Sequence, residues 1–432
     1  MKRVFVQSFG CRASQADGAA IETALIENGY IPANNAANAE LIVLNTCTVT
    51  HNADVDTKRT IRGLHRDHPN LEILVTGCHA QRAPEELAAL EGVRWVVGNT
   101  HKDQIPQIVS EQTELYHGRI FSGEIARQIA FQAMPVRGPQ EDRARPNLKI
   151  QDGCSNRCSF CIIPNVRGRS RSANADSVVE EIQKLGEEHA EIVLTGINLG
   201  RWGRDLPGNL RFPDLLRRVL RETNARRIRI SSVEPMDWSS DLLELVTTEE
   251  RIAKHVHLPL QSGSDAVLKR MFRKYRTRHY AGRIQLARQN MPDAAIGADV
   301  MTGFPGETDG EFEETVSFIQ QQPFTYLHVF TYSERPGTPA ANYANSVPMP
   351  VRHERTRILR EISAAKNLEF RRLMLGKRLS AVTLEQPRTA LTSNFLRIEL
   401  SQHFPSNQII SVAIGSITGS GLREQALLPV LA

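Results

Sequence analysis

The stretch KIQDGCSNRCSFC, residues 149–161, places three cysteines in a loop that directly follows a strand-like run. The spacing C-x3-C-x2-C lets Cys154, Cys158 and Cys161 hold three corners of an iron–sulfur cube and leaves the fourth iron without a protein ligand. An open iron of this kind can be chelated by the amino and carboxylate groups of S-adenosylmethionine. A structural zinc site would need a fourth cysteine or histidine, and none lies nearby in the sequence. The loop therefore indicates an iron–sulfur site with one open position.

The remaining cysteines, Cys11, Cys47 and Cys78, are far apart in the chain, and each follows a short apolar run. Helical stretches separate these runs, a pattern typical of an open parallel α/β sheet. The expected strands are VFVQ at 4–7, LIVLN at 41–45, LEILVT at 71–76 and RWVV at 94–97. Because ligands bind at the carboxyl ends of such strands, we expect the three thiols to meet in one crevice. They would form a second three-thiolate set, again one ligand short of closing a cubane.

Strand and helix patterns alternate six times between residues 146 and 370. Six units are too few for a closed eight-fold barrel, so we expect a partial, open (βα)6 barrel with its chemistry at the strand C-termini. The first helix is expected to begin near Ser177, which with Glu180 has the spacing of a capping box. The expected strands are NLKIQD (147–152), EIVLTG (191–196), RIRISS (227–232), HVHLPL (255–260), IGADVM (296–301) and YLHVFT (326–331).

Two segments outside this barrel differ in character. Residues 108–145 lack clean periodicity and are expected to form a connector with an irregular strand or two. Residues 371–432 carry short alternating runs, which predict a small β-barrel. This last part has seven Lys and Arg residues against three Glu, and so carries four of the chain's five net positive charges. A basic barrel of this kind is expected to bind nucleic acid, and the alternative is a solvated surface with a chance excess of arginine.

The composition narrows the class of protein. With 41% hydrophobic and 23% charged residues, the 432-residue chain is neither fibrous nor fully disordered. No run approaches the ~18 apolar residues of a membrane span. The first residues, MKRVFVQSFG, enter a strand pattern without the features of a signal peptide. We therefore expect a cytoplasmic protein without membrane association, in which clustered thiols are metal ligands or catalytic groups.

With an aromatic residue before its last cysteine, the loop after the first barrel strand resembles the radical S-adenosylmethionine superfamily. Further stretches are similar to the methylthiotransferase family, and the likeness covers essentially the whole chain. These stretches are GCRAS (10–14), NTCTVTHNAD (45–54), VTGCHAQRAPEEL (75–87) and KIQDGCSNRCSFCIIPNVRGRSRS (149–172). The resemblance implies an N-terminal cluster domain at 1–107, a connector at 108–145, a radical core at 146–370 and a C-terminal TRAM domain at 371–432.

Within that family, the likeness is closest to the enzymes that act on threonylcarbamoyladenosine next to the tRNA anticodon. The stretches that point there are VLNTCTVTHNAD (43–54), CSFCIIPNVRGRSRS (158–172) and LTGINLGRWGRD (194–205). One position departs from the family, which commonly has Asn where this chain has Ser14. This departure leaves open any role of that side chain but not the role of Cys11.

The resemblance implies two 4Fe-4S clusters and S-adenosylmethionine as cofactors. Cys154, Cys158 and Cys161 would bind the radical-generating cluster, whereas Cys11, Cys47 and Cys78 would bind an auxiliary cluster that presents sulfur. The implied reaction adds a methylthio group to carbon 2 of threonylcarbamoyladenosine at tRNA position 37. The implied partners are the anticodon stem-loop of tRNA and a low-potential electron donor of flavodoxin or ferredoxin type. The chain is expected to act as a monomer.

By analogy with the superfamily, polar groups at the barrel strand ends would surround the cofactor, although each could equally be a turn or capping residue. The candidates are Gly196, Asn198, Ser232, Glu234, Gln261, Ser262 and Asp299. Arg167, Arg169 and Arg171 could pair with a carboxylate or with tRNA phosphate, or form a solvated basic loop. His79, beside Cys78, is a weaker ligand candidate for which surface exposure is expected.

Two rival functions remain open at this point. The first is the same chemistry on another target, either isopentenyladenosine in tRNA or an aspartate of a ribosomal protein. The basic terminal barrel favours RNA over protein. The second is a metal- or RNA-binding module without catalysis, in which the clusters are only structural.

Overall fold

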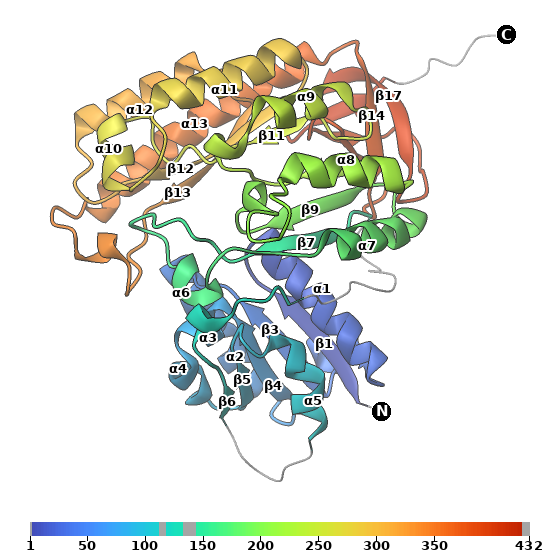
Figure 1. Cartoon of the computed structure of the whole chain (residues 1–432), viewed down its shortest axis with the longest axis vertical. Coiled ribbons are helices and arrows are strands. Elements are labelled where there is room, and N and C mark those ends of the chain that lie inside the picture. Colours follow the sequence, from blue (N-terminus) through green and yellow to red (C-terminus); the bar gives the residue numbers. More distant parts are fainter. Residues whose placement is uncertain (1, 112–117, 133–143, 426–432) are drawn as a thin grey trace.

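The computed structural model of the chain describes residues 2–111, 118–132 and 144–425. An N-terminal α/β sheet lies against an open barrel of strands and helices, and a small closed β-barrel packs at the far end of the latter (Figure 1). In the expected connector 108–145, the described part holds β6 (Arg119–Phe121), and 112–117 and 133–143 lie outside the described residues. None of the helices in the described ranges is long and apolar enough to cross a membrane.

The N-terminal sheet is parallel throughout, in the order β2-β1-β3-β4-β5-β6, as the apolar runs predict. Its central strand β3 is fully buried, because helices cover both faces. The two-residue edge strand β2 was not expected from the sequence, whereas the three-residue edge strand β6 lies in the connector 108–145, where an irregular strand or two was expected. The strands are β1 (Arg3–Ser8), β2 (Ile31–Pro32), β3 (Leu41–Thr46), β4 (Glu72–Gly77) and β5 (Val93–Val97). The helices are α1 (Arg12–Glu27), α2 (His51–Asp67), α3 (Cys78–Arg82), α4 (Pro84–Ala88) and α5 (Ile105–Ser110).

The middle of the chain forms the expected open barrel, with two groups of hydrogen-bonded strands, β10-β9-β7-β8 and β11-β12-β13. The six main strands of the barrel, β7 and β9–β13, pair in parallel within these groups. The short β8 (Arg171–Ser172) pairs antiparallel with β7. The others are β7 (Asn147–Asp152), β9 (Ile192–Gly196), β10 (Ile228–Ile230), β11 (His255–His257), β12 (Ala295–Thr302) and β13 (Tyr326–Thr331). The helices are α6 (Ile163–Arg167), α7 (Ala175–Glu188), α8 (Phe212–Glu222), α9 (Ser240–Thr248), α10 (Asp265–Arg270), α11 (Thr277–Asn290), α12 (Asp309–Gln321) and α13 (Met349–Leu373).

The helix α7 begins earlier than the sequence reading expected. Its N-cap is Asn174, whose side chain accepts a hydrogen bond from the Asp176 backbone N–H, so the predicted capping box of Ser177 and Glu180 is wrong. Asparagine is among the best N-cap residues, and here it lies three residues before the serine.

The C-terminal strands close into a five-stranded barrel in the order β14-β15-β16-β18-β17, as predicted for 371–432, of which 426–432 lie outside the described residues. Arg229 of β10 fixes this barrel to the open one. It pairs with Glu191 at 2.7 Å and donates to the carbonyls of Thr392 and Ser393. Part of the barrel's positive charge is used internally, because Arg371 is buried and donates to the Thr418 carbonyl. The strands are β14 (Arg378–Thr383), β15 (Thr389–Thr392), β16 (Arg397–Glu399), β17 (Ile409–Ile417) and β18 (Leu422–Glu424).

A buried charge cluster fixes the N-terminal sheet against the open barrel. Asp17 of α1 pairs with Lys102 at 2.8 Å and with Arg167 at 2.9 Å, and it also pairs with Lys149 of β7. Burial acts to raise the pKa of the Asp17 carboxyl, but these three cations hold that pKa well below its usual range. The two cysteine-bearing parts of the chain are therefore held in a fixed relation.

Candidate functional site

The loop of Cys154, Cys158 and Cys161 folds at the carboxyl end of β7. It begins at Gly153, whose φ of +67° and closeness to the Arg169 carbonyl exclude a side chain, since a Cβ would lie 2.0 Å from that oxygen. The Cys154 N–H donates to the Gly168 carbonyl at 3.0 Å, and the Asn156 N–H lies 3.4 Å from the Cys154 sulfur. Burial, together with the neighbouring Cys158 and Cys154, raises the pKa of the Cys161 thiol to about 12. The three thiols thus lie close together in a partly buried position.

Two side chains from other barrel strands reach these sulfurs. Asn198, after β9, places its amide nitrogen 3.6 Å from the Cys154 sulfur, and its amide oxygen is buried without a hydrogen-bond partner. Arg273, after α10, lies 3.2 Å from the Cys158 sulfur and 2.5 Å from the Glu234 carboxylate. The sequence reading proposed Asn198 and Glu234 as site residues but missed Arg273.

Cys11, Cys47 and Cys78 lie at the ends of three adjacent strands, β1, β3 and β4. Gly10 lies so close to Cys47 that a Cβ on it would be 2.9 Å from the Cys47 sulfur. Burial raises the pKa of the Cys47 thiol to about 12, and Cys78 and Cys11 are close enough to raise it as well. The structure therefore brings together the three thiols that the strand pattern expected to meet.

The backbone around this second set favours negative charge. Cys11 is the N-cap of the 16-residue α1, and its thiol is exposed, whereas Cys47 and Cys78 are buried. The N-terminus of a helix carries a partial positive charge that stabilises anions such as thiolates. A Cβ on Gly77 would lie 2.4 Å from the Thr46 carbonyl, so glycine allows the close contact between the ends of β3 and β4, just before Cys47 and Cys78.

Arg167 connects the two cysteine sets. It is 1% exposed, and its guanidinium lies 3.2 Å from the Cys78 sulfur and 3.0 Å from Asp152, which precedes the loop of Cys154. Arg171 is also buried and donates to the Arg167 and Arg169 carbonyls. The reading of 167–171 as a solvated basic loop is therefore wrong for these two residues, and only Arg169 is exposed.

The other candidate cofactor residues lie at the strand ends as expected. Gly196 ends β9, where a Cβ would lie 3.0 Å from Gln151. Gln261 has a φ of +68°, which is uncommon for a side chain other than glycine, and its N–H donates to the Asp299 carbonyl at 2.8 Å. Ser262 is buried against Thr315 of α12, 3.1 Å between hydroxyl oxygens, so it supports the loop.

Ser232 and Asp299 belong to a chain of polar groups across the barrel. The Ser232 hydroxyl hydrogen-bonds to Nδ1 of His257, and Nε2 of the same ring lies 3.4 Å from the Asp299 carboxylate. Nδ1 of His328 lies 3.3 Å from the same carboxylate oxygen of Asp299. Burial opposes the charge on Asp299, but the two imidazoles hold its pKa below the usual range. The sequence reading did not single out His257 and His328.

His79 is not exposed, contrary to expectation. Its ring is fully buried between Asp54 and Glu86, 3.6 and 3.8 Å from their carboxylates, although it neighbours Cys78 in sequence. Burial lowers the pKa of His79, so the ring is neutral. Ser14, the departure from the family pattern, is buried with its hydroxyl 3.8 Å from the Cys11 sulfur.

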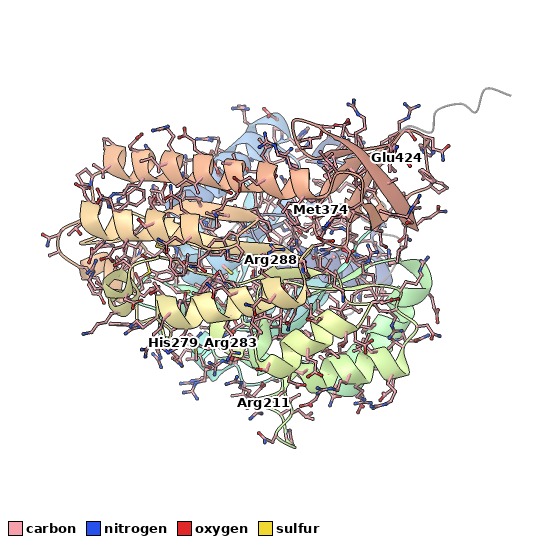
Figure 2. All side chains as sticks on the ribbon, turned by 90° about the horizontal axis from the view of Figure 1, so that it is seen from above. Arg211, His279, Arg283, Arg288, Met374 and Glu424 are labelled. Carbon is pink, nitrogen blue, oxygen red and sulfur yellow. The ribbon has the colours of Figure 1, made fainter. Side chains whose placement is uncertain are left out.

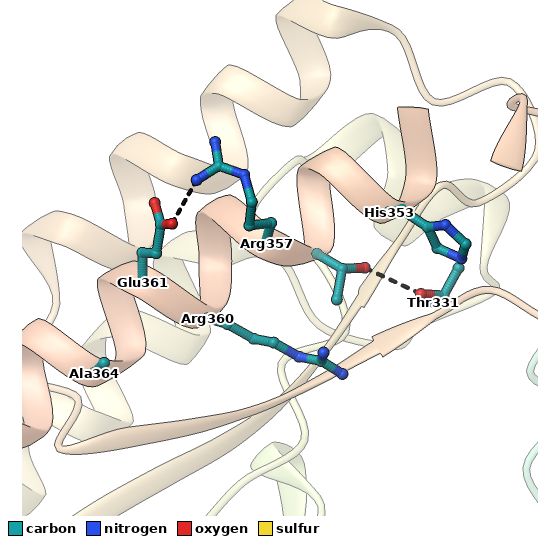
Figure 3. Close-up of a pocket in the computed structure, with 7 residues that line it drawn as sticks. Thr331, His353, Arg357, Arg360, Glu361 and Ala364 are labelled. Atoms are coloured by element: carbon teal, nitrogen blue, oxygen red, sulfur yellow. Dashed lines mark hydrogen bonds and ion pairs between the residues drawn. The ribbon is translucent and has the colours of Figure 1, made fainter. Parts of the chain in front are cut away.

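A separate hollow of about 530 Å³ lies along α13 and the edge strand β13. Figure 3 shows Arg357 turned toward Glu361, whereas Arg360 reaches toward the strand that carries Thr331. The hollow contains none of the six cysteines. It lies near the seam with the N-terminal sheet, because Ser333, just after β13, accepts a hydrogen bond from the His51 N–H at 3.0 Å.

Both thiol sets fit iron–sulfur clusters in their chemistry. Soft thiolates select iron–sulfur clusters or zinc, and each set offers three sulfurs. Burial makes a bare thiolate unfavourable, and a bound metal centre supplies the positive charge that offsets this cost. Hydrogen bonds from Arg167 and Arg273 to sulfur are the kind of contact that adjusts a cluster's reduction potential.

Comparison with known proteins agrees with this geometry. Residues 3–98 match the model of the uncharacterized protein family UPF0004, and residues 148–319 match the radical SAM superfamily, which implies a 4Fe-4S cluster and S-adenosylmethionine. The radical S-adenosylmethionine methyltransferase TsrM from Kitasatospora setae has a similar fold, with a TM-score of 0.58 and 14% identity over 78% of this chain and 76% of that one.

Curated relatives span nearly the full length. The threonylcarbamoyladenosine tRNA methylthiotransferase MtaB of Aquifex aeolicus is 36% identical over 95% of this chain and 100% of its own. MtaB of Bacillus subtilis is 38% identical over 84% of this chain and 80% of its own. The tRNA-2-methylthio-N(6)-dimethylallyladenosine synthase of Clostridium botulinum is 33% identical over 85% of this chain and 83% of its own. With relatives of this similarity and coverage, the chain belongs to the tRNA methylthiotransferase family of radical S-adenosylmethionine enzymes.

Proposed function

We propose that this transferase adds a methylthio group to carbon 2 of threonylcarbamoyladenosine at position 37 of tRNA. The single observation that carries the proposal is the pairing of two separate three-thiol sites, linked by Arg167, in one rigid arrangement. The choice of nucleoside is supported by four relatives that match over most of their length and are named threonylcarbamoyladenosine tRNA methylthiotransferases.

Each thiol set has its own part in the proposal. Cys154, Cys158 and Cys161 hold the cluster that, when bound, supplies the electron for reductive cleavage of S-adenosylmethionine. Cys11, Cys47 and Cys78 hold a second, auxiliary 4Fe-4S cluster at which sulfur is presented. Asp17 and its cations keep the two parts from separating, and the auxiliary thiols therefore stay at a constant distance from the radical-generating loop.

The barrel residues would hold S-adenosylmethionine and the substrate. Asn198, whose amide nitrogen lies 3.6 Å from the Cys154 sulfur, has a buried amide oxygen without a hydrogen-bond partner, which suits it to accept a hydrogen bond from the amino group of S-adenosylmethionine. Glu234 and Asp299 are anionic groups that can accept hydrogen bonds from ribose hydroxyls or an exocyclic amine. Gly196, Ser232 and Gln261 shape the same strand ends.

The anticodon stem-loop would bind near the seam between the barrel and the N-terminal sheet. The substrate must reach both thiol sets, and the hollow with Arg360 lies beside this seam. The small barrel would add contacts to phosphate through its exposed cations, such as Arg372, Arg378 and Arg388. Because the substrate is tRNA, we place the reaction in the cytoplasm, with the chain acting as a monomer.

The domain limits follow the same proposal. We keep a cluster domain at 1–107, a radical core at 146–370 and a TRAM domain at 371–432, with the connector 108–145 between the first two. In the described residues, the open barrel has one large hydrophobic cluster and the sheet has two, whereas the cluster of the closed barrel also includes Ala295 and Phe370 of the radical core.

Nucleoside mass spectrometry of tRNA from a strain that lacks the gene tests the proposal. We expect loss of methylthio-threonylcarbamoyladenosine and recovery by the wild-type gene but not by a Cys47→Ala variant. Loss of methylthio-isopentenyladenosine instead, or of the modified ribosomal aspartate, would replace the substrate but keep the chemistry. Purified protein that is reduced anaerobically and leaves S-adenosylmethionine intact would favour a non-catalytic binding module.

A further inference from the structure

A groove beside the radical-generating loop has a strongly positive lining. Hollows of about 220 and 300 Å³ adjoin a narrow section whose lining includes Cys158 itself. The cations of this lining are Arg201, Arg204, Arg273, Lys274, Arg278 and Arg283, and the acids are Asp205 and Glu234. The surface thus carries an excess of positive charge beside Cys158.

Several of these charges are available for a partner. Among the described residues, the side chains of Lys274, Arg278 and Arg283 make no hydrogen bond or ion pair, in contrast to Arg201 and Arg204, which share Asp237. Figure 2 shows Arg283 beside His279 on α11, the helix that borders the groove. Unpaired cations that face solvent attract an acidic surface and are screened by salt.

Two apolar side chains stand in the middle of this charged rim. Met236 and Phe272 line the narrow section and are 48% and 53% exposed. Phe272 has a φ of +58° and follows the end of α10, where its N–H bonds to the Lys269 carbonyl at 3.0 Å. Glycine is favoured at such a position, and a bulky residue there is strained. An exposed aromatic side chain on a strained backbone adds no stability to the isolated chain, and it therefore points to a binding role.

The groove lies apart from the seam between the barrel and the N-terminal sheet, where the tRNA is proposed to bind. The N-terminal sheet packs against α6, β7 and β9 and against the segment after β13. The groove is lined instead by the loops after β7, β9 and β10, by the segment that follows α10 and by α11. A protein bound in it could therefore approach Cys158 while tRNA occupies the seam between the two thiol sets.

We propose that this groove docks an acidic one-electron carrier protein of flavodoxin or ferredoxin type. The proposal rests on the proposed function, in which Cys154, Cys158 and Cys161 hold the radical-generating cluster. The carrier loses one electron and the cluster gains it, with no bond made or broken in this chain. Transient redox complexes have small interfaces with a small apolar centre and complementary charges at the rim. The groove has the same arrangement, with Phe272 at its centre and cations around it.

The first test measures binding to the holoenzyme. Oxidised flavodoxin is titrated by calorimetry against the wild type, the double variant Lys274→Glu, Arg278→Glu, and Phe272→Asn. We expect about tenfold weaker binding for the double variant, with the difference shrinking at high salt. Phe272→Asn should weaken binding while the melting temperature stays equal or rises, because asparagine tolerates the left-handed backbone. The matched control Arg226→Glu, an exposed charge before β10 and outside the groove, should bind as the wild type does.

The second test separates docking from chemistry. Cleavage of S-adenosylmethionine is driven either by reduced flavodoxin or by dithionite, a small reductant that needs no docking surface. The groove variants should lose about tenfold in the flavodoxin reaction and nothing in the dithionite reaction. Equal rates with flavodoxin, or equal losses with both reductants, would overturn the proposal, and so would a loss of tRNA affinity without loss of carrier affinity. A wild type inactive with dithionite would instead refute the proposed function.

Discussion

The buried Arg167 offers the most informative single substitution for stability. Replacing it with Met removes contacts to Asp17 at 2.9 Å, Asp152 at 3.0 Å and the Cys78 sulfur at 3.2 Å. Removing one partner of a buried ion pair costs about 3–5 kcal/mol. Both carboxylates keep Lys149, and Asp17 also keeps Lys102, so we expect about 3 kcal/mol, at the lower end. For domains of this size, that loss corresponds to a fall in melting temperature of roughly 6–12 °C.

Calorimetric unfolding under anaerobic conditions measures this change. Arg167→Lys keeps one charge but not the planar fork that reaches three acceptors, and it should lie between the wild type and Arg167→Met. Arg169→Met, on the exposed neighbour, should stay within about 0.5 kcal/mol of the wild type. An Arg167→Met protein that melts within 2 °C of the wild type would refute the idea that this residue joins the two parts.

Three further predictions concern other parts of the chain. Gly153→Ala should prevent iron binding at the radical-generating loop, because the added Cβ would lie 2.0 Å from the Arg169 carbonyl. Iron analysis of this variant should therefore give about half the iron content of the wild type. Burial and the nearby Arg229 hold the pKa of His255 well below 6.5 in the folded chain. When the pH falls, His255 is therefore protonated in the unfolded chain at a pH at which it is still neutral in the folded chain. Stability should therefore fall as the pH drops below 6.5, by about 1.4 kcal/mol for this group at pH 5.5, and His255→Gln should lose that part of the slope in acid titrations of unfolding. Arg360→Glu should weaken tRNA binding in filter assays and reduce its salt slope by about 1, and unchanged affinity would exclude the hollow along α13 as an RNA contact.

The sequence predicted those parts of the molecule that depend on local pattern. Apolar β-branched runs located the main strands, and the ends of those runs located both cysteine sets, because strand direction alone brings Cys11, Cys47 and Cys78 to one edge. The very short β2 was not predicted, because two residues carry no periodic signal.

The contacts that adjust the site could not be predicted in this way. Arg273 meets Cys158 across 115 residues and Arg167 meets Cys78 across 89, and nothing local distinguishes these arginines from solvated ones. His79 was misjudged for the same reason, because its burial depends on Asp54 and Glu86 from other helices. Such pairs arise from tertiary packing, which overrides the preference of charged and polar residues for the surface.

The central claim is that six cysteines form two separate cluster sites in one protein. Iron analysis of anaerobically reconstituted protein, with a Cys11→Ala, Cys47→Ala, Cys78→Ala variant beside the wild type, tests it directly. The account predicts about eight irons per wild-type chain and about four in the variant, which should still cleave S-adenosylmethionine but transfer no methylthio group. About four irons in both proteins would contradict it.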